Sequence, residues 1–110
     1  MATVTASQTS RYTFTEDGTL TVTGRGQCIV KIVGNTWGGG TMSMLDDVCV
    51  AGEFKAVDID GTAITLDTGS RTYYLEGYHP SDRVQLRLSL SGSTSPDIDV
   101  YVSFDFPPAV

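Results

Sequence analysis

Few residues in this 110-residue chain have the type and spacing that catalysis requires. The single histidine, His79, is followed directly by Pro80, Ser81 and Asp82. A nucleophile, its base and the group that orients the base must converge in space, and residues this close in one loop do not normally reach that geometry. We therefore interpret His79 as part of a solvated turn and assign no catalytic residue.

Patterns for metal ligands are also incomplete. Cys28 and Cys49 lack the close spacing of a zinc site, and one histidine cannot complete the usual four ligands. Asp58-Ile59-Asp60-Gly61 is similar to the start of a calcium loop, but the further carboxylates of such a loop do not follow. We predict a turn there, and no metal or cofactor.

The remaining polar pairs leave alternatives open. Cys28 and Cys49 could form a disulfide between two strands, but in a cytosolic product they are expected to stay reduced as small core residues. The Asp46-Asp47 pair could in principle supply the acid and base of a glycosidase. Acidic residues on the outer face of strands are common, however, so this pair is not assigned as a site.

Aromatic residues offer better candidates for binding than for chemistry. Trp37 lies in the glycine-rich stretch Gly34 to Gly40, and an aromatic side chain on a loop can stack on a sugar or insert into a partner's groove. It can equally pack over the edge of the core. Tyr78 lies in a second loop. We take Trp37 and Tyr78 as candidate interaction residues.

Alternating sequence patterns predict the β-strands that must position these residues. In Arg83 to Leu90, the apolar residues Val84, Leu86, Leu88 and Leu90 alternate strictly with polar ones. The other segments with strand-like patterns are Arg11 to Thr15, Thr19 to Thr23, Gln27 to Val33, Thr41 to Leu45, Arg71 to Glu76 and Ile98 to Phe106. The Asp17-Gly18 pair predicts one hairpin turn, and Asp58-Ile59-Asp60-Gly61 predicts a second between strands at Phe54 to Val57 and Ala63 to Leu66.

About seven or eight short strands with turn signals every 8 to 12 residues or so predict an all-β fold, specifically a two-sheet β-sandwich that is jelly-roll-like. We expect the sandwich domain to span residues 11–110. Residues 1–10 are polar and have no apolar face of their own, so we expect a flexible, extended N-terminal arm. Its Thr3, Val4 and Thr5 favour extended backbone and are candidates for adding a strand to a partner's sheet edge.

Composition and charge narrow the classes of partner. Hydrophobic residues make up 40% of the chain and charged residues 18%, as in a packed globular protein. The net charge of -6 repels phosphate backbones and anionic lipid, so we expect neither nucleic acid nor membrane as a partner. The first residues show no signal-peptide pattern, which predicts a product made in the cytoplasm.

One resemblance covers Tyr12 to Phe106. The motifs that carry it are Gly34-Asn35-Thr36-Trp37-Gly38-Gly39-Gly40-Thr41, Gly52-Glu53-Phe54, Tyr73-Tyr74-Leu75-Glu76-Gly77, Arg83-Val84-Gln85-Leu86-Arg87-Leu88 and Ile98-Asp99-Val100-Tyr101-Val102. Their order resembles that of small all-β virion proteins of tailed bacteriophages, of the head decoration or cement type. The resemblance implies a virion protein made in the host cytoplasm that forms a homo-oligomer, often a trimer. It also implies docking on the major capsid protein or another virion protein, and it supplies no catalytic residues.

A second function stays open. A carbohydrate-binding module or a tail-fibre-associated receptor-binding domain would share the same strands and loops. The two functions differ in what Trp37 touches. A sugar binder should bind glycans as an isolated monomer, whereas a decoration protein should bind only assembled particles. An enzyme is not expected.

Overall fold

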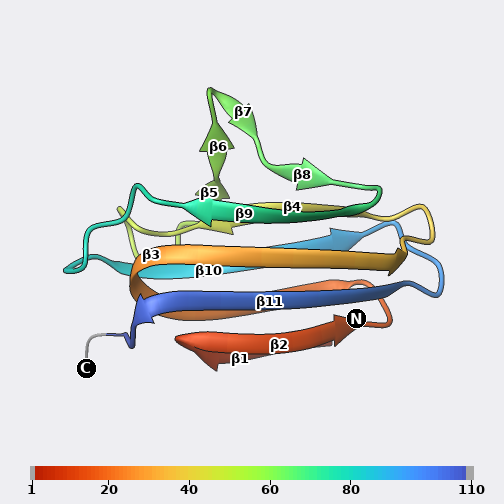
Figure 1. Cartoon of the computed structure of the whole chain (residues 1–110), viewed down its shortest axis with the longest axis horizontal. Coiled ribbons are helices and arrows are strands. Elements are labelled where there is room, and N and C mark those ends of the chain that lie inside the picture. Colours follow the sequence, from red (N-terminus) through yellow and green to blue (C-terminus); the bar gives the residue numbers. More distant parts are fainter. Residues whose placement is uncertain (1, 109–110) are drawn as a thin grey trace.

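The computed structural model describes residues 2–108, which form eleven strands and no helix, so the all-β prediction is confirmed. Met1 and residues 109–110, the ends of the expected arm and domain, lie outside the described residues. The strands are β1 (Ala2–Ser7), β2 (Thr9–Phe14), β3 (Gly18–Thr36), β4 (Thr41–Asp46), β5 (Lys55–Ala56), β6 (Asp58–Ile59), β7 (Thr62–Ala63), β8 (Thr65–Leu66), β9 (Ser70–Leu75), β10 (Arg83–Ser91) and β11 (Asp97–Phe106). Nine of them form one large, mostly antiparallel sheet, and β6 pairs with β7 in a small second sheet (Figure 1).

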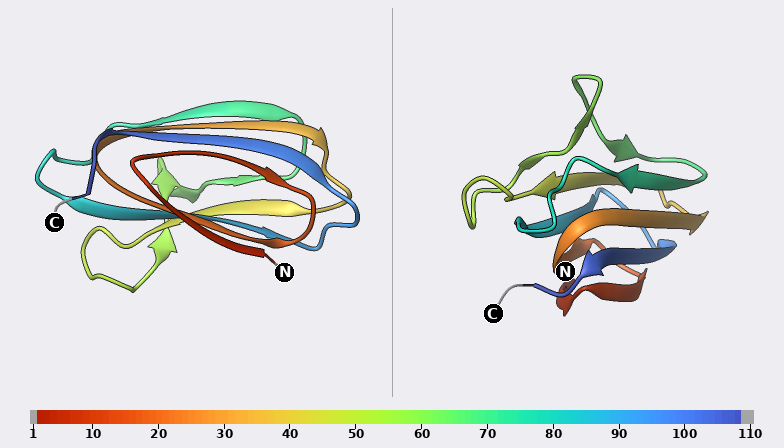
Figure 2. Two further views of the ribbon diagram at one scale, coloured as in Figure 1. Left: turned by 90° about the horizontal axis from the view of Figure 1, so that it is seen from below. Right: turned by 60° about the vertical axis from the view of Figure 1, so that its left-hand side comes forward.

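Strand β3 organises the large sheet because its two halves have different neighbours. The first half lies between β1 and β10, and β10 continues to β4, which pairs with β5 and β8. The second half lies between β9 and β11, and β11 continues to β2. The sheet therefore curls, and its two halves lie one above the other (Figure 2).

Two glycines permit the bend between the halves of β3. A Cβ atom on Gly24 would lie 2.3 Å from the Phe104 ring, so only glycine lets β3 approach β11 this closely. Gly26 has a φ of +80°, a left-handed conformation that side chains rarely adopt. The bend thus depends on residues that sequence alternation does not reveal.

The core lies between the two halves of the sheet. In β10, Val84, Leu86 and Leu88 are fully buried, as the alternation predicts. Each buried side chain of this size contributes roughly 1.5–3 kcal/mol. The other fully buried large side chains come from both halves of the sheet: Phe14, Leu20, Val22, Val30, Ile32, Met42, Ile98, Val100 and Phe104.

The prediction that residues 1–10 form a flexible arm outside the fold is wrong. Strand β1 pairs in parallel with β3 from Ala2 to Ser7, and β2 begins at Thr9. Val4 and Ala6 pack against the core, while Thr3 is exposed. Short alternation of this kind gives a weak sequence signal, but an edge of the curled sheet supplies main-chain hydrogen bonds that order the segment.

Gln8 forms the corner at which the chain passes from β1 to β2. Its φ is +60°, and its backbone N–H donates to the carbonyl oxygen of Thr23 at 2.8 Å. Its carbonyl oxygen accepts a hydrogen bond from the backbone N–H of Phe104, also at 2.8 Å. The N-terminal segment therefore joins the two halves of the sheet along one side.

Of the two predicted hairpin turns, the one at Asp60-Gly61 is confirmed and the one at Asp17-Gly18 is wrong. The strands that flank Asp60-Gly61 are Asp58–Ile59 and Thr62–Ala63, closer to the turn than the predicted strands at Phe54 to Val57 and Ala63 to Leu66. β6 and β7 pair around Asp60 and Gly61, both with positive φ, as an Asp-Gly turn requires. By contrast, β2 pairs with β11 and not with β3. Asp17 accepts hydrogen bonds from the backbone N–H groups of Gly92 and Ser93 at 3.1 and 2.9 Å. It therefore holds the β10–β11 loop instead of closing a hairpin.

Candidate functional site

The most distinctive surface is the outward side of β2, β11, β3 and β9, which we call the outer face and define by Arg11, Ile29, Lys31, Tyr74 and Tyr101. Register places Arg11 beside Tyr101 and Tyr101 beside Lys31, in one row across three strands. Tyr74 lies beside Ile29 in the next row. Because the residues that alternate with these face the core, the row of side chains points outward.

The outer face is apolar and aromatic at its centre. Ile29 is 45% exposed and Tyr74 is 65% exposed, and because they are neighbours across β3 and β9 they form one continuous apolar surface. A shallow groove of about 550 Å³ runs over β2, β11 and β3, lined by Thr9, Ser10, Arg11, Ile29, Lys31, Tyr101, Val102 and Ser103. A rigid sheet thus presents apolar surface to solvent.

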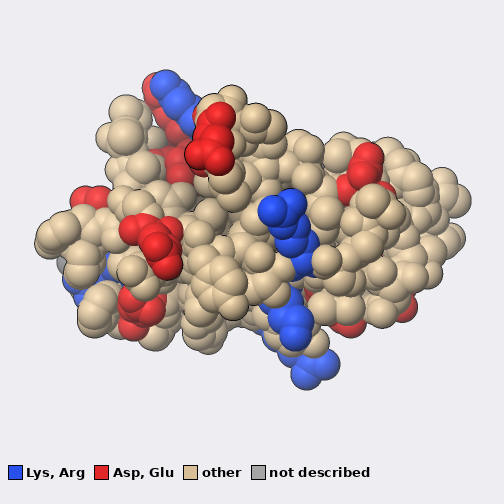
Figure 3. Space-filling model, turned by 45° about the horizontal axis from the view of Figure 1, so that its top comes forward, with Lys and Arg blue, Asp and Glu red and all other residues tan. Residues whose placement is uncertain are grey.

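Cationic side chains border this apolar surface. The guanidinium carbon of Arg11 lies 5.4 Å from the centre of the Tyr101 ring, within the range of a cation–π contact. The side chain of Lys31 makes no hydrogen bond or ion pair with residues 2–108. Figure 3 views this side obliquely and shows Lys and Arg side chains in a short column across its middle, with acidic side chains to either side. The outer face is therefore locally basic in an acidic chain.

A second hollow of about 530 Å³, the Tyr78 cleft, adjoins the end of β9. Its acidic lining residues are Asp46, Asp58, Glu76 and Asp82, and its other lining residues include Val48, Ile59 and Tyr74. The Tyr78 hydroxyl donates a hydrogen bond to the Asp46 carboxylate. Burial, and then this hydrogen bond and the charge of Asp46, raise the pKa of Tyr78 above its ordinary value. Tyr78 therefore stays protonated and forms part of the wall of the cleft.

The candidate residues from the sequence are not brought together. Thr3, Val4 and Thr5 lie on β1, Trp37 follows β3, and Tyr78 follows β9. Trp37 is half-buried against the core, and its indole Nε1–H donates to the carbonyl oxygen of Gly69 at 2.9 Å. Of the two positions considered for Trp37, on a binding loop or packed over the edge of the core, the structure shows the packed one.

The groups considered for chemistry take part in local contacts. The Nδ1 atom of His79 accepts a hydrogen bond from the Ser81 backbone N–H at 3.1 Å, and Asp82 accepts one from the His79 backbone N–H at 3.2 Å. These contacts form a turn, as interpreted from the sequence. Cys28 is buried, Cys49 is exposed, and both are free thiols.

Metal sites and membrane-spanning helices are absent from residues 2–108. No group of three or more His, Cys, Asp and Glu side chains there could hold a metal ion. The same residues contain no helix that could cross a membrane.

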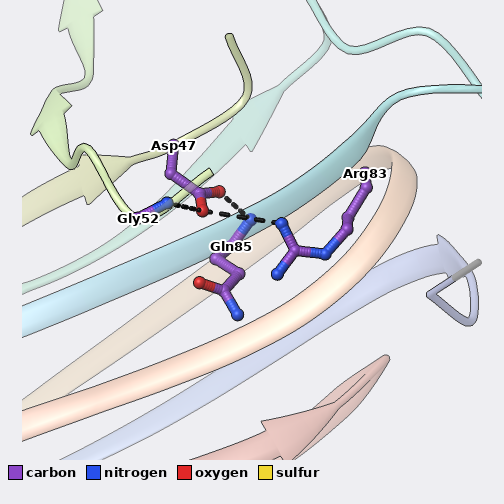
Figure 4. A network of polar contacts seen from close by, with 4 residues as sticks. All are labelled: Asp47, Gly52, Arg83 and Gln85. Atoms are coloured by element: carbon purple, nitrogen blue, oxygen red, sulfur yellow. Dashed lines mark hydrogen bonds and ion pairs between the residues drawn. The ribbon is translucent and has the colours of Figure 1, made fainter. Parts of the chain in front are cut away.

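Asp47 has a role that sequence reasoning missed. Its carboxylate is buried and accepts hydrogen bonds from the backbone N–H groups of Gln85 at 2.7 Å and Gly52 at 3.0 Å (Figure 4). The Arg83 guanidinium lies 3.6 Å away. Gln85 also donates to Asp47 at 3.1 Å and accepts from Arg83 at 2.8 Å when its amide nitrogen faces Asp47. Asp47 thus anchors the loop after β4 to β10.

Ile29, Lys31 and Tyr101 were also missed as surface residues. A signal was present, because Gln27 to Val33 carries apolar residues on both faces of the strand. One of those faces, with Cys28, packs in the core, and the other, with Ile29, is exposed. Apolar residues on both sides of the segment Gln27 to Val33 were therefore the sequence signal for the outer face.

Comparison with protein-family models, curated proteins and solved structures finds no match for the chain. The outer face presents exposed Ile29, Tyr74 and Lys31 side chains to solvent, a geometry that can contact a partner.

Proposed function

We propose that this protein is a bacteriophage virion structural protein, a capsid decoration or cement protein that docks on the assembled head and stabilises it. The observation that carries the proposal is the outer face, where Ile29 and Tyr74 lie exposed and Tyr101 lies half-buried in the groove beside them. Exposed apolar patches of this kind mark contact surfaces for other proteins. The order of motifs between Tyr12 and Phe106, which resembles that of phage decoration proteins, supports the virion as the assembly in which this surface is used.

We also propose the finer fold, a two-layer β-sandwich with jelly-roll connections. The strand order β2-β11-β3-β9 in one layer and β1-β3-β10-β4-β8 in the other supports it, with β3 contributing to both. Two packed layers of mostly antiparallel strands are the general arrangement of a jelly roll, a fold used by viral capsid and lectin domains. Fold alone does not choose between those functions.

The outer face has the composition of a protein contact surface. Tyrosine and arginine are enriched among the residues that contribute most to binding energy at interfaces. In the Arg11–Tyr101 pair Arg11 is exposed and Tyr101 is half-buried. A cation–π contact of this type strengthens from about 0.5–1 to about 2 kcal/mol when water is excluded. Covering the outer face would therefore stabilise an assembly. The protein would be made in the host cytoplasm and incorporated into the virion.

Carbohydrate binding is the second candidate, because Tyr74 and Tyr101 present aromatic side chains on one sheet face. Aromatic faces on a rigid support can stack on sugar rings. A carbohydrate-binding module or tail-fibre-associated domain would then use the outer face instead of Trp37, whose indole is engaged with Gly69.

Co-sedimentation tests the proposed function. The protein is mixed with undecorated heads assembled from the major capsid protein of the same genome, and with the unassembled subunit. The proposal predicts saturable binding to heads, no binding to the subunit, and a higher melting temperature of decorated heads. A blank glycan array is expected in parallel. Binding to glycans without binding to heads would contradict the proposal and favour the carbohydrate function.

A further inference from the structure

We propose that the free edge of β9 binds an extended segment of a partner protein that carries lysine or arginine, and that this segment lies as an added strand between β9 and residues 57–65. We call the space between these two parts of the chain the edge groove. The inference goes beyond the proposed function, because the outer face is the outward side of the sheet and the edge groove follows the border of the sheet. Of the residues that define the outer face, only Tyr74 also lines the edge groove.

Strand β9 has an unpaired edge. It pairs with β3 on one side, and no strand within residues 2–108 pairs with its other side. In an antiparallel pair, every second residue directs its backbone N–H and C=O groups away from the partner strand. An unpaired row of such groups is a template for another strand. The six residues of β9 therefore offer main-chain hydrogen bonds to an extended segment.

Two hollows follow this edge and leave room for such a segment. The Tyr78 cleft is lined by Ile59 and by the residues that end β9, including Glu76. A smaller hollow of about 280 Å³ is lined by Ile59, Ile64, Arg71 and Tyr73. Because Ile59 lines both hollows, they adjoin and together follow β9 from Arg71 to Glu76. Figure 1 shows the β6–β7 hairpin rising beyond β9 on the side away from β3.

The wall opposite β9 is held in place by the core. Val57 and Ile64, at the base of the β6–β7 hairpin, are buried. The Ile64 backbone N–H donates to the Val57 carbonyl oxygen at 2.8 Å, and the Val57 backbone N–H donates to the Met44 carbonyl oxygen at 3.0 Å. The base of the hairpin is thus fixed to β4. A segment that enters the groove meets a preformed wall, which lowers the entropic cost of binding.

Charge identifies the chemistry of the occupant. Asp58 on the hairpin and Glu76 after β9 line the Tyr78 cleft, together with Asp46 and Asp82. The side chains of Asp58 and Glu76 make no hydrogen bond or ion pair with residues 2–108, so their charges are unneutralised. Arg71 lies at the other end of the groove. The basic residues of the occupant therefore belong at the Glu76 end, where the charges are complementary.

Apolar contact adds to this charge preference. Ile59 is 44% exposed and lies where the two hollows meet. Successive side chains of a strand point to opposite sides, so a segment in which basic and apolar residues alternate can cover Ile59 and place its basic residues beside the carboxylates. In strand addition of this kind, main-chain hydrogen bonds give affinity and the alternating side chains give specificity.

A soluble synthetic peptide of alternating lysine and valine tests the inference on the full chain. We expect saturable binding by calorimetry, weaker binding as salt rises, and slower hydrogen exchange at alternate backbone amides of β9. A peptide of alternating glutamate and valine should not bind. A peptide of alternating lysine and proline keeps the positive charge but cannot pair as a strand, and it should not slow exchange in β9.

Charge reversal locates the site. The double variant Asp58→Lys/Glu76→Lys should weaken binding of the lysine–valine peptide about tenfold or more. Asp67→Lys makes the same change of charge at an exposed position outside both hollows and should bind like wild type. Thermal melts establish that each variant is folded.

Several results would overturn the inference: no binding of the lysine–valine peptide, equal binding of the glutamate or proline peptide, unchanged binding by the double variant, or slowed exchange on another strand instead of β9. The test uses no heads, so its outcome is independent of the proposed function.

Discussion

The indole Nε1–H of Trp37 donates a hydrogen bond to the carbonyl oxygen of Gly69, and this contact ties the loop after β3 to the turn before β9. Gly34 makes the contact possible. A Cβ atom at Gly34 would lie 2.1 Å from the Trp37 Nε1 atom and 2.5 Å from the Gly69 oxygen. The absence of a side chain at Gly34 therefore leaves room for the hydrogen bond that joins the loop at Trp37 to the turn at Gly69.

Gly34→Ala should displace the Trp37 indole. Trp37 is the only tryptophan, so its emission reports this site alone. We expect a red-shifted emission maximum and a loss of about 1–3 kcal/mol from the free energy of unfolding, from the lost hydrogen bond and the close contact. Gly77→Ala is the control, because no atom lies within 4 Å of its added Cβ. Unchanged emission from Gly34→Ala would show that Trp37 is not held by this contact.

Asp47→Ala should be among the most destabilising polar substitutions. It leaves the Gln85 and Gly52 backbone N–H groups without their acceptor, which costs about 2–4 kcal/mol in total. Arg83→Ala should cost less than about 1 kcal/mol, because that side chain is 40% exposed. Urea denaturation measures both, with the exposed Asp67→Ala as reference. Equal effects of Asp47→Ala and Asp67→Ala would refute the anchoring role.

Removing residues 1–7 should destabilise the fold, because β1 pairs along β3 and packs Val4 and Ala6 on the core. We expect a loss of at least about 2 kcal/mol, or about 8 °C in Tm for a domain of this size. Val4→Ala should reproduce part of this loss, whereas Thr3→Ala, at an exposed position on the same strand, should not. If the truncated chain has the same Tm as the full chain, β1 does not contribute to the stability of the fold and the prediction is contradicted.

The stability of the fold should fall at alkaline pH. Burial raises the pKa of the Cys28 thiol from 9.0 to about 12. The folded protein therefore keeps this proton while the unfolded chain loses it, so the stabilisation is complete below about pH 9 and is lost as pH rises toward about 12. Cys28→Ala should reduce this alkaline loss and leave the part that the raised pKa of Tyr78 contributes, whereas Cys49→Ala should not change it. A thiol reagent at pH 8 should modify only the exposed Cys49 in folded protein; two fast-reacting thiols would contradict the burial of Cys28.

The sequence was most informative about single strands and least about how they pair. Alternation identified β10 and its buried face, and the Asp60-Gly61 pair identified the β6–β7 hairpin, because both signals are local. The pairing of β2 with β11 was not predictable in this way. It depends on the bend of β3 at Gly24 and Gly26, which brings strands from opposite ends of the chain together.

The same distinction applies to the candidate site. Trp37 and Tyr78 were chosen as aromatic residues on loops, and their hydrogen bonds to Gly69 and Asp46 come from residues about thirty positions away. The outer face combines Arg11, Ile29 and Tyr101 from three strands that only the fold places side by side. A surface made across strands has no contiguous motif.

The central claim is that the outer face is covered by protein in the working assembly. Oxidative footprinting of tyrosine measures this directly, on the dilute isolated protein and on the protein bound to heads, with Phe106 as an exposed reference near the end of β11. We predict that Tyr74 and Tyr101 lose most of their labelling in the assembly while Phe106 keeps its own. Labelling of Tyr74 and Tyr101 that is the same in both states would contradict the claim.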